Sequence, residues 1–111
     1  MNIAIRTDAS LQIGTGHVMR CLTLADRFKM TGAVCTFICR EHPGNLLDLI
    51  RQRGHEAIGL VTDISTSSKH NTTQLAHAAW LGTDWITDAE QTRAALGDTT
   101  ADWLIVDHYA L

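Results

Sequence analysis

The chain has 111 residues, of which 45% are hydrophobic, and its formal net charge is -3. This length makes one small domain with a single core. The acidic balance excludes nucleic acid as the main partner, because such proteins carry a basic face. No apolar run is long enough to cross a bilayer and the first residues lack a signal-peptide pattern, so we expect a cytoplasmic domain without membrane contact.

The first half alternates strand-like and helix-like segments. Residues 2–6 predict a short strand, and residues 7–16 predict a turn region. Apolar residues recur at helical spacing over residues 17–31, and Gly32 can supply the C-terminal stop of that helix. The run 33–39 is continuously apolar and rich in β-branched side chains, which is typical of a strand buried on both faces.

The middle of the chain begins with a break at a Pro-Gly pair. Asn45 follows it as an expected N-cap of a second helix, which ends near Gly54. Residues 56–61 predict a third strand. The polar stretch 62–73 has no periodicity and predicts a loop, and residues 74–81 predict a helix.

The C-terminal part predicts one more helix and one more strand. Residues 87–90 (TDAE) have the spacing of a capping box, which predicts a helix up to Gly97. Residues 103–106 predict a final buried strand. Strands that alternate with helices imply an α/β fold, a Rossmann-like parallel sheet with flanking helices, whose ligands bind beyond the carboxyl ends of the strands.

The three cysteines, Cys21, Cys35 and Cys39, are interpreted as buried thiols. Cys35 and Cys39 share one face of a predicted strand but lie roughly 13 Å apart, at about 3.3 Å per residue, which is too far for a disulfide. Zinc is not expected, because the chain has no Cys-x-x-Cys or closely paired Cys/His set.

The segment Gly14–Arg20 (GTGHVMR) follows the first predicted strand and opens the first predicted helix. Its glycines allow a tight turn close to a ligand, and His17 stands where the helix N-terminus favours an anion and disfavours imidazolium. This pattern predicts a general base that acts on a phosphorylated or nucleotide-linked substrate. The alternative is a plain helix start in which His17 caps the backbone.

Arg20 lies one helical turn beyond His17. It is placed to pair with a phosphate or with a carboxylate such as Asp8, and a surface salt bridge is the alternative. Asp8 and Ser10 are equally typical of turns. Asp107 and Tyr109 follow the last predicted strand, so they would either contact sugar hydroxyls and amides or support the neighbouring loop.

Four further histidines lack metal-ligand spacing, and we expect them to be solvated: His42, His55, His70 and His77.

Three motifs give the chain a family resemblance. Residues 6–25 (RTDASLQIGTGHVMRCLTLA) strongly resemble the start of the nucleotide-sugar hydrolases of pseudaminic acid biosynthesis, which are related to the spore-coat polysaccharide proteins. Residues 80–82 (WLG) with 88–92 (DAEQT), and then 104–109 (LIVDHY), are also similar to that family and occur in its order.

The resemblance implies one half of a GT-B-like enzyme that cleaves UDP-2,4-diacetamido-2,4,6-trideoxy-β-L-altropyranose. The bond from the anomeric carbon to the diphosphate oxygen is hydrolysed with inversion, and UDP is released. The catalytic histidine of the family corresponds to His17, which would activate the attacking water. No metal and no cofactor is implied. The residues expected to contact the substrate are Gly14, Gly16, Arg20, Asp8, Asp107 and Tyr109.

Residues 1–111 correspond to the N-terminal Rossmann-like domain of the family, and its nucleotide-binding domain has no counterpart in them. We therefore expect the chain alone to have little or no hydrolase activity. We also expect an exposed sheet edge or face that favours self-association. A glycosyltransferase-like enzyme and a non-catalytic Rossmann-like module are the alternatives.

Overall fold

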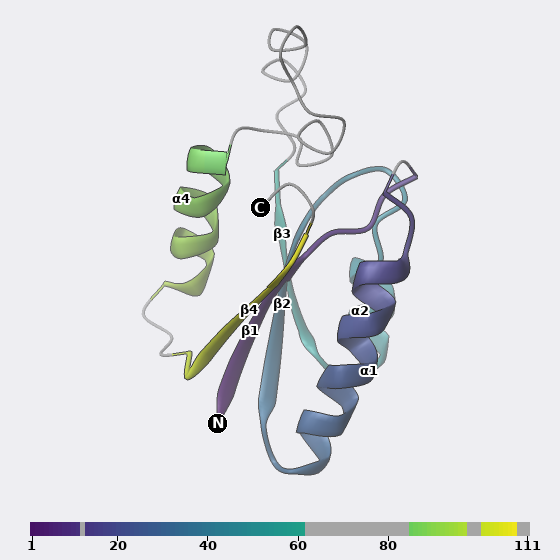
Figure 1. Ribbon diagram of the computed structural model, residues 1–111, viewed down its shortest axis with the longest axis vertical. Helices are drawn as coiled ribbons and strands as arrows, with labels where there is room; N and C mark the ends of the chain where they lie inside the picture. The colour runs from purple at the N-terminus through teal and green to yellow at the C-terminus, as the bar shows by residue number, and fades with distance from the viewer. Residues whose placement is uncertain (12, 62–84, 98–100, 109–111) are drawn as a thin grey trace, which may run out of the picture.

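The computed structural model describes residues 1–11, 13–61, 85–97 and 101–108. Its helices and strands follow one another as β1 (Asn2–Thr7), α1 (Gly16–Met30), β2 (Val34–Arg40), α2 (Leu47–Gln52), β3 (Glu56–Leu60), α4 (Trp85–Leu96) and β4 (Trp103–Asp107) (Figure 1). The loop predicted over 62–73 and the helix predicted over 74–81 lie outside the described residues.

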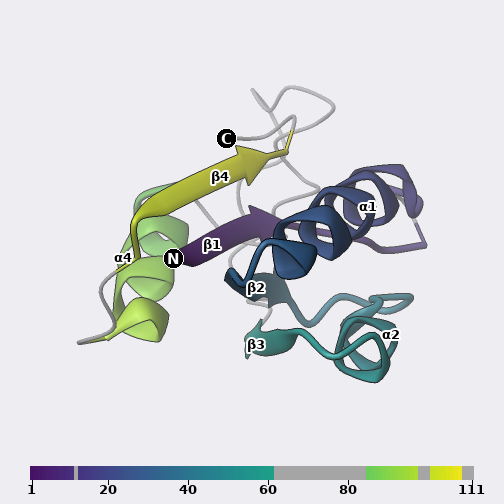
Figure 2. The ribbon, with the colours of Figure 1, turned by 90° about the horizontal axis from the view of Figure 1, so that it is seen from below.

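The four strands form one parallel sheet in the order β3-β2-β1-β4. Helices α1 and α2 cover one face of this sheet, and α4 lies on the opposite face (Figure 2). The protein therefore has the small α/β, Rossmann-like fold that the alternation of strands and helices predicts. Among the described residues, no helix has the length and apolar character needed to span a bilayer.

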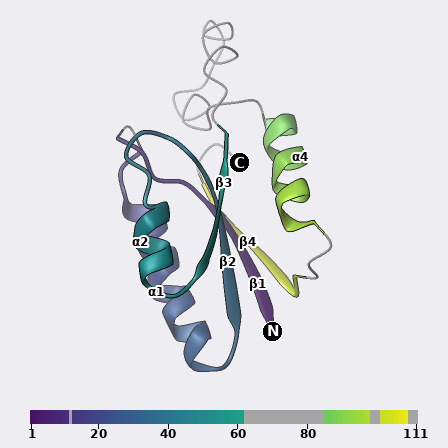
Figure 3. The ribbon, with the colours of Figure 1, turned by 180° about the vertical axis from the view of Figure 1, so that it is seen from behind.

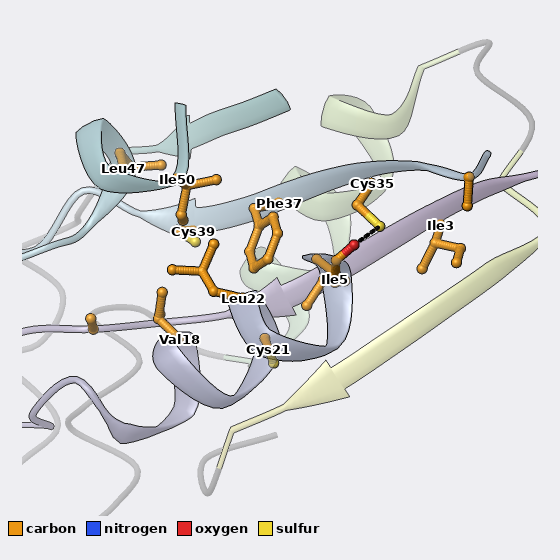
Figure 4. Close-up of a cluster of buried hydrophobic side chains, with 13 residues drawn as sticks. Ile3, Ile5, Val18, Cys21, Leu22, Cys35, Phe37, Cys39, Leu47 and Ile50 are labelled. Atoms are coloured by element: carbon orange, nitrogen blue, oxygen red, sulfur yellow. Dashed lines mark hydrogen bonds between the residues drawn. The ribbon is translucent and has the colours of Figure 1, made fainter. Parts of the chain in front are cut away.

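Side chains alternate between the two faces along each strand, as the pleat requires. On the α1 face, Ile5 and Phe37 pack with Leu22 and Ile50 in the main hydrophobic core (Figure 4). Completely buried side chains of this kind contribute roughly 1.5–3 kcal/mol each relative to exposure. Most of the folding free energy from burial thus lies between α1, α2 and the sheet.

The first helix ends as the sequence predicts. Gly32 has a φ of +91°, its backbone N–H donates to the carbonyl of Lys29, and the N–H of Ala33 donates to the carbonyl of Phe28. This pair of bonds is the Schellman arrangement, which needs a residue in the left-handed region and therefore favours glycine.

Two helix starts differ in detail from the prediction. Asn45 does bond the next turn, since its Oδ1 accepts from the N–H of Leu47 at 3.1 Å, but α2 begins at Leu47 and is short. The prediction that residues 87–90 form a capping box at a helix start is wrong, because α4 already includes Trp85 and Ile86. Asp88 points into the protein and forms buried ion pairs instead.

The prediction that the last strand is buried is also wrong. β4 stands at the end of the described sheet and pairs only with β1 among the described strands. Trp103, Leu104 and Val106 are exposed as a result. An apolar sequence indicates a strand suited to burial, but burial also requires neighbours on both sides.

Candidate functional site

The turn that precedes α1 meets the end of β4 at the carboxyl edge of the sheet. His17 is the second residue of α1, and Asp107 is the last residue of β4. Asp107 shares the α1 face of β4 with Ile105 by alternation, so its carboxylate faces the helix. The sequence placed these two segments at the same edge, and the structure brings them into direct contact.

His17, Arg20 and Asp107 form what we call the His17 cluster. Nδ1 of His17 lies 2.8 Å from Oδ1 of Asp107. The Arg20 guanidinium donates to the same carboxylate, with Nε 3.0 Å from Oδ2 and Nη2 2.8 Å from Oδ2. Arg20 therefore pairs with Asp107 and not with Asp8, the carboxylate named as its example partner from the sequence.

The contacts of His17 select one tautomer of its ring. A carboxylate accepts hydrogen bonds and donates none, so the short contact with Asp107 requires a proton on Nδ1. Arg20 Nη2, at 3.2 Å from Nδ1, then donates to Asp107 and not to the ring. With the proton on Nδ1, the basic lone pair of a neutral imidazole is on Nε2.

The electrostatics of Asp107 fit this arrangement. Partial burial by itself raises the pKa of this carboxyl, but the hydrogen bonds from His17 and Arg20 outweigh burial and hold the pKa below its ordinary value. Asp107 is therefore a carboxylate at neutral pH. A carboxylate fixed by an arginine is suited to orient a histidine ring, as in acid–base dyads of enzymes.

The glycines of the turn differ in what the backbone requires. Gly14 has a φ of +84°, which a side chain would make unfavourable, and its N–H donates to the carbonyl of Ser10 at 2.8 Å. Ser10 is a turn former, since its hydroxyl accepts from the N–H of Ile13 at 2.9 Å. Among the described residues beyond the immediate chain neighbours, no atom lies within 4 Å of a Cβ built on Gly14 or Gly16, so the space beside both is open in the described part of the protein.

A second group, which we call the Arg6 network, lies on the α4 side of the sheet. It consists of Arg6, Asp8, Arg40 and Asp88, all nearly inaccessible to solvent. Arg6 donates to both oxygens of Asp8 and to both oxygens of Asp88, and Arg40 donates to Asp88 through Nη2 at 2.5 Å. Two buried cations are thus matched by two buried anions.

Asp8 is completely buried and acts as the centre of this network. Its carboxylate accepts from the backbone N–H of Arg40 at 2.7 Å, and it lies 3.0 Å from Nε2 of His108 and 3.6 Å from Nε2 of His42. Burial alone would raise the pKa of Asp8, but the neighbouring His108, His42 and Arg6 hold it far below its ordinary value. Contact of Asp8 with a substrate stays a prediction.

The histidines depart from the sequence expectation. His42 and His55 are buried and paired with aspartates, so the prediction that they are solvated is wrong. His55 donates through Nε2 to the Asp26 carboxylate at 2.8 Å and packs against Phe37. A strand-end or turn position does not indicate burial by itself, which is why these pairs were missed. His70 and His77 lie outside the described residues, as does Tyr109.

His108 links the two groups. Its ring is nearly parallel to that of His17, with an angle of 16° between the planes and 6.5 Å between the centroids, while its Nε2 faces Asp8. The two His–Asp pairs therefore stand side by side at the edge where a parallel sheet binds ligands. Within the described residues, no group of three or more His, Cys, Asp or Glu is arranged to hold a metal ion.

No protein-family model matches this chain, and no curated protein matches it. The assignment of a function therefore rests on the residues of the site and on the motifs quoted above.

Proposed function

We propose that this chain carries the catalytic base of a nucleotide-sugar hydrolase. In this proposal, His17 activates a water molecule that attacks the anomeric carbon of a UDP-linked diacetamido-trideoxy sugar. The observation that carries the proposal is the contact between Nδ1 of His17 and the Asp107 carboxylate, at the start of α1 and the carboxyl edge of the sheet.

The proposed reaction uses few protein groups. The water oxygen forms a bond to the anomeric carbon as the bond from that carbon to the diphosphate oxygen breaks, with inversion. Nε2 of His17 takes the proton of the water, and UDP leaves with the bonding electron pair. A diphosphate is a good leaving group, so a strong general acid is not required. A positioned base of this kind contributes on the order of 10²–10⁴-fold to the rate.

The surroundings of His17 support the role of base. Its Nδ1 is occupied by Asp107, which leaves Nε2 as the nitrogen that accepts a proton from water. The open space beside Gly14 and Gly16 gives room for a ligand next to the helix N-terminus, where anions are stabilised. The motif in residues 6–25 supports the family, a GT-B-like half, in which the corresponding histidine is the base.

A direct assay tests the proposal. UDP release from the UDP-linked diacetamido-trideoxy sugar is measured for the 111-residue chain and for the same chain joined to the nucleotide-binding domain of a family member. We expect little or no release by the chain alone and clear release by the joined protein. Formation of the inverted free sugar, followed by NMR, separates hydrolysis from transfer to an acceptor.

Two substitutions assign the roles within the joined protein. His17→Gln should reduce the rate on the order of 10²–10⁴-fold, and Asp107→Asn should reduce it because the ring loses its fixed tautomer. Asp102→Asn, at the opposite end of β4, is the control and should retain activity. Unchanged turnover in His17→Gln would remove this residue from the mechanism.

A further inference from the structure

His108 is a buried histidine that the proposed reaction does not use. It follows Asp107 in the sequence, its ring lies nearly parallel to that of His17, and its Nε2 lies 3.0 Å from Oδ2 of Asp8. A carboxylate oxygen offers only lone pairs, so Nε2 of His108 carries a proton. His108 thus stands between the Arg6 network and the His17 cluster.

The contact between His108 and Asp8 begins where the backbone pairing of two strands ends. Strands β1 and β4 run side by side and pair up to Thr7 and Asp107 (Figure 3). The hydroxyl of Thr7 also donates to the carbonyl of Asp107 at 3.0 Å. Asp8 and His108 are the next residues along the two chain segments, so their side chains extend the link between β1 and β4 by one residue.

Asp8 is a rigid anchor for this contact. Its Oδ1 accepts from Nη1 of Arg6 at 2.6 Å and from the backbone N–H of Arg40 at 2.7 Å, and its Oδ2 accepts from Nη2 of Arg6 at 3.1 Å. The residue is completely buried. Charge-assisted bonds to both oxygens hold the carboxylate in one orientation, so a side chain that contacts it is held as well.

The Asp107 carboxylate is held from the solvent side by Arg20. The side chain of Arg20 is 65% exposed. Exposed ion pairs of this kind are weak, because water and salt screen them and a long side chain loses entropy in forming them. A carboxylate that keeps a fixed direction therefore also needs support from the interior, and His108, the next residue, is anchored there.

We propose that His108 is a positioning residue for the base. It connects the buried Asp8 to the backbone of Asp107 and so keeps the Asp107 carboxylate at Nδ1 of His17. His108 acts through Asp107 and takes no proton from the attacking water. Its effect on the rate rests on the proposed function of His17, but the state of the His17 ring can be measured without any activity.

Two substitutions separate the contact with Asp8 from the neighbouring ring of His17. His108→Gln removes the ring but keeps a side-chain N–H that can reach Asp8, whereas His108→Phe keeps a ring and removes the N–H. Long-range ¹H–¹⁵N correlation spectra of the 111-residue chain report which nitrogen of His17 carries the proton. We expect His108→Gln to keep it on Nδ1 and His108→Phe to move part of the population to Nε2.

His55→Phe is the matched control. It also removes a buried histidine whose Nε2 bonds an aspartate, Asp26 at 2.8 Å, and it should leave the His17 ring as in the wild type. Circular dichroism verifies the fold of each variant. If His108→Phe does not fold, His108→Ala takes its place, because it removes the N–H without adding bulk.

The same variants in the joined protein show the effect on the reaction. His108→Phe should lower kcat on the order of tenfold or more, as is typical when a group that orients an active residue is lost, with KM nearly unchanged. His108→Gln should retain most of the activity. A raised KM at unchanged kcat would show that His108 contacts the substrate and would overturn the positioning role.

The spectra decide the proposal independently of turnover. A His17 ring that keeps its wild-type tautomer in His108→Phe, or that changes as much in His108→Gln or His55→Phe, would refute it. If the ring responds as expected but the wild-type joined protein releases no UDP, the positioning role stands and the proposed hydrolase function fails.

Discussion

The guanidinium of Arg6 forms a bidentate ion pair with the carboxylate of Asp88, with Nε 3.1 Å from Oδ2 and Nη2 2.5 Å from Oδ1. Arg6 belongs to β1 and Asp88 to α4, and both side chains are almost fully buried. Burial by itself lowers the pKa of Arg6, but the bonds to Asp88 and the nearby Asp8 raise it above its ordinary value. This ion pair connects α4 to strand β1 of the sheet.

Breaking this pair should destabilise the protein strongly. Asp88→Ala leaves the Arg6 and Arg40 cations buried with half of their counter-charge, and we expect a loss of about 3–5 kcal/mol in the free energy of unfolding by urea. The control is Asp48→Ala, which removes an exposed carboxylate that is 3.6 Å from Arg51. Its effect should stay within about 1 kcal/mol. Equal losses in the two variants would show that the buried pair does not hold α4.

Acid should destabilise the protein through Asp8. The pKa of Asp8 is far lower in the folded protein than its ordinary value of about 3.9, so its contribution is fully present above that value and is lost as the pH falls below it. We therefore expect the free energy of unfolding to fall from about pH 5 to pH 2.

Two variants isolate the origin of this acid dependence. Asp8→Asn should flatten the decline, and Asp107→Asn should flatten it by a smaller amount, because the pKa of Asp107 is also lowered. If Asp8→Asn does not fold, the comparison of Asp107→Asn with the wild type still tests whether carboxylates with lowered pKa values cause the decline. Asp48→Asn, an exposed carboxylate, serves as the reference that follows the wild type. A decline that is the same in all four proteins would exclude these two groups as its cause.

The buried thiols should react slowly. Burial raises the pKa of Cys39 to about 12, and burial together with the Asp107 carboxylate raises the pKa of Cys21 to about 11. Because the thiolate is the reactive form, alkylation of these residues at about pH 8 should be on the order of a hundredfold or more slower in the folded than in the unfolded chain. Mass spectrometry of labelled peptides measures each rate separately.

Asp107→Asn supplies the internal control for this effect. The Sγ of Cys21 lies 3.7 Å from Oδ2 of Asp107, so loss of the negative charge should accelerate alkylation of Cys21. Cys39 in the same molecule should keep its rate. Acceleration of both thiols would instead indicate loosening of the core.

The alternation of strands and helices along the sequence predicts at which edge of the sheet the candidate site lies. Parallel strands end at one edge, so the sequence places the turn around His17 and the segment after residue 106 at the same edge, where the structure brings them into contact. The cysteines were likewise expected to be buried, and all three are buried and free. These features depend on local periodicity and topology, which a single sequence carries.

The Arg6 network could not be foreseen in this way, because its members are far apart in the chain. A signal was present: Arg6 and Arg40 interrupt two apolar strands at positions that alternation directs inward. A charge at such a position requires a buried counter-charge. Which carboxylate supplies it depends on how α4 packs, and the spacing of residues 87–90 predicts a helix cap that includes Asp88 instead.

The proposed base requires that the His17 ring carries its proton on Nδ1. Long-range ¹H–¹⁵N correlation spectra of the chain at about pH 8.5, above the usual titration range of imidazole, report which ring nitrogen carries the proton. We predict that Nδ1 of His17 is protonated and Nε2 is not, and that Asp107→Asn shifts this tautomer balance while His55 stays as in the wild type. A His17 ring protonated on Nε2 in the wild-type protein would contradict the proposed base.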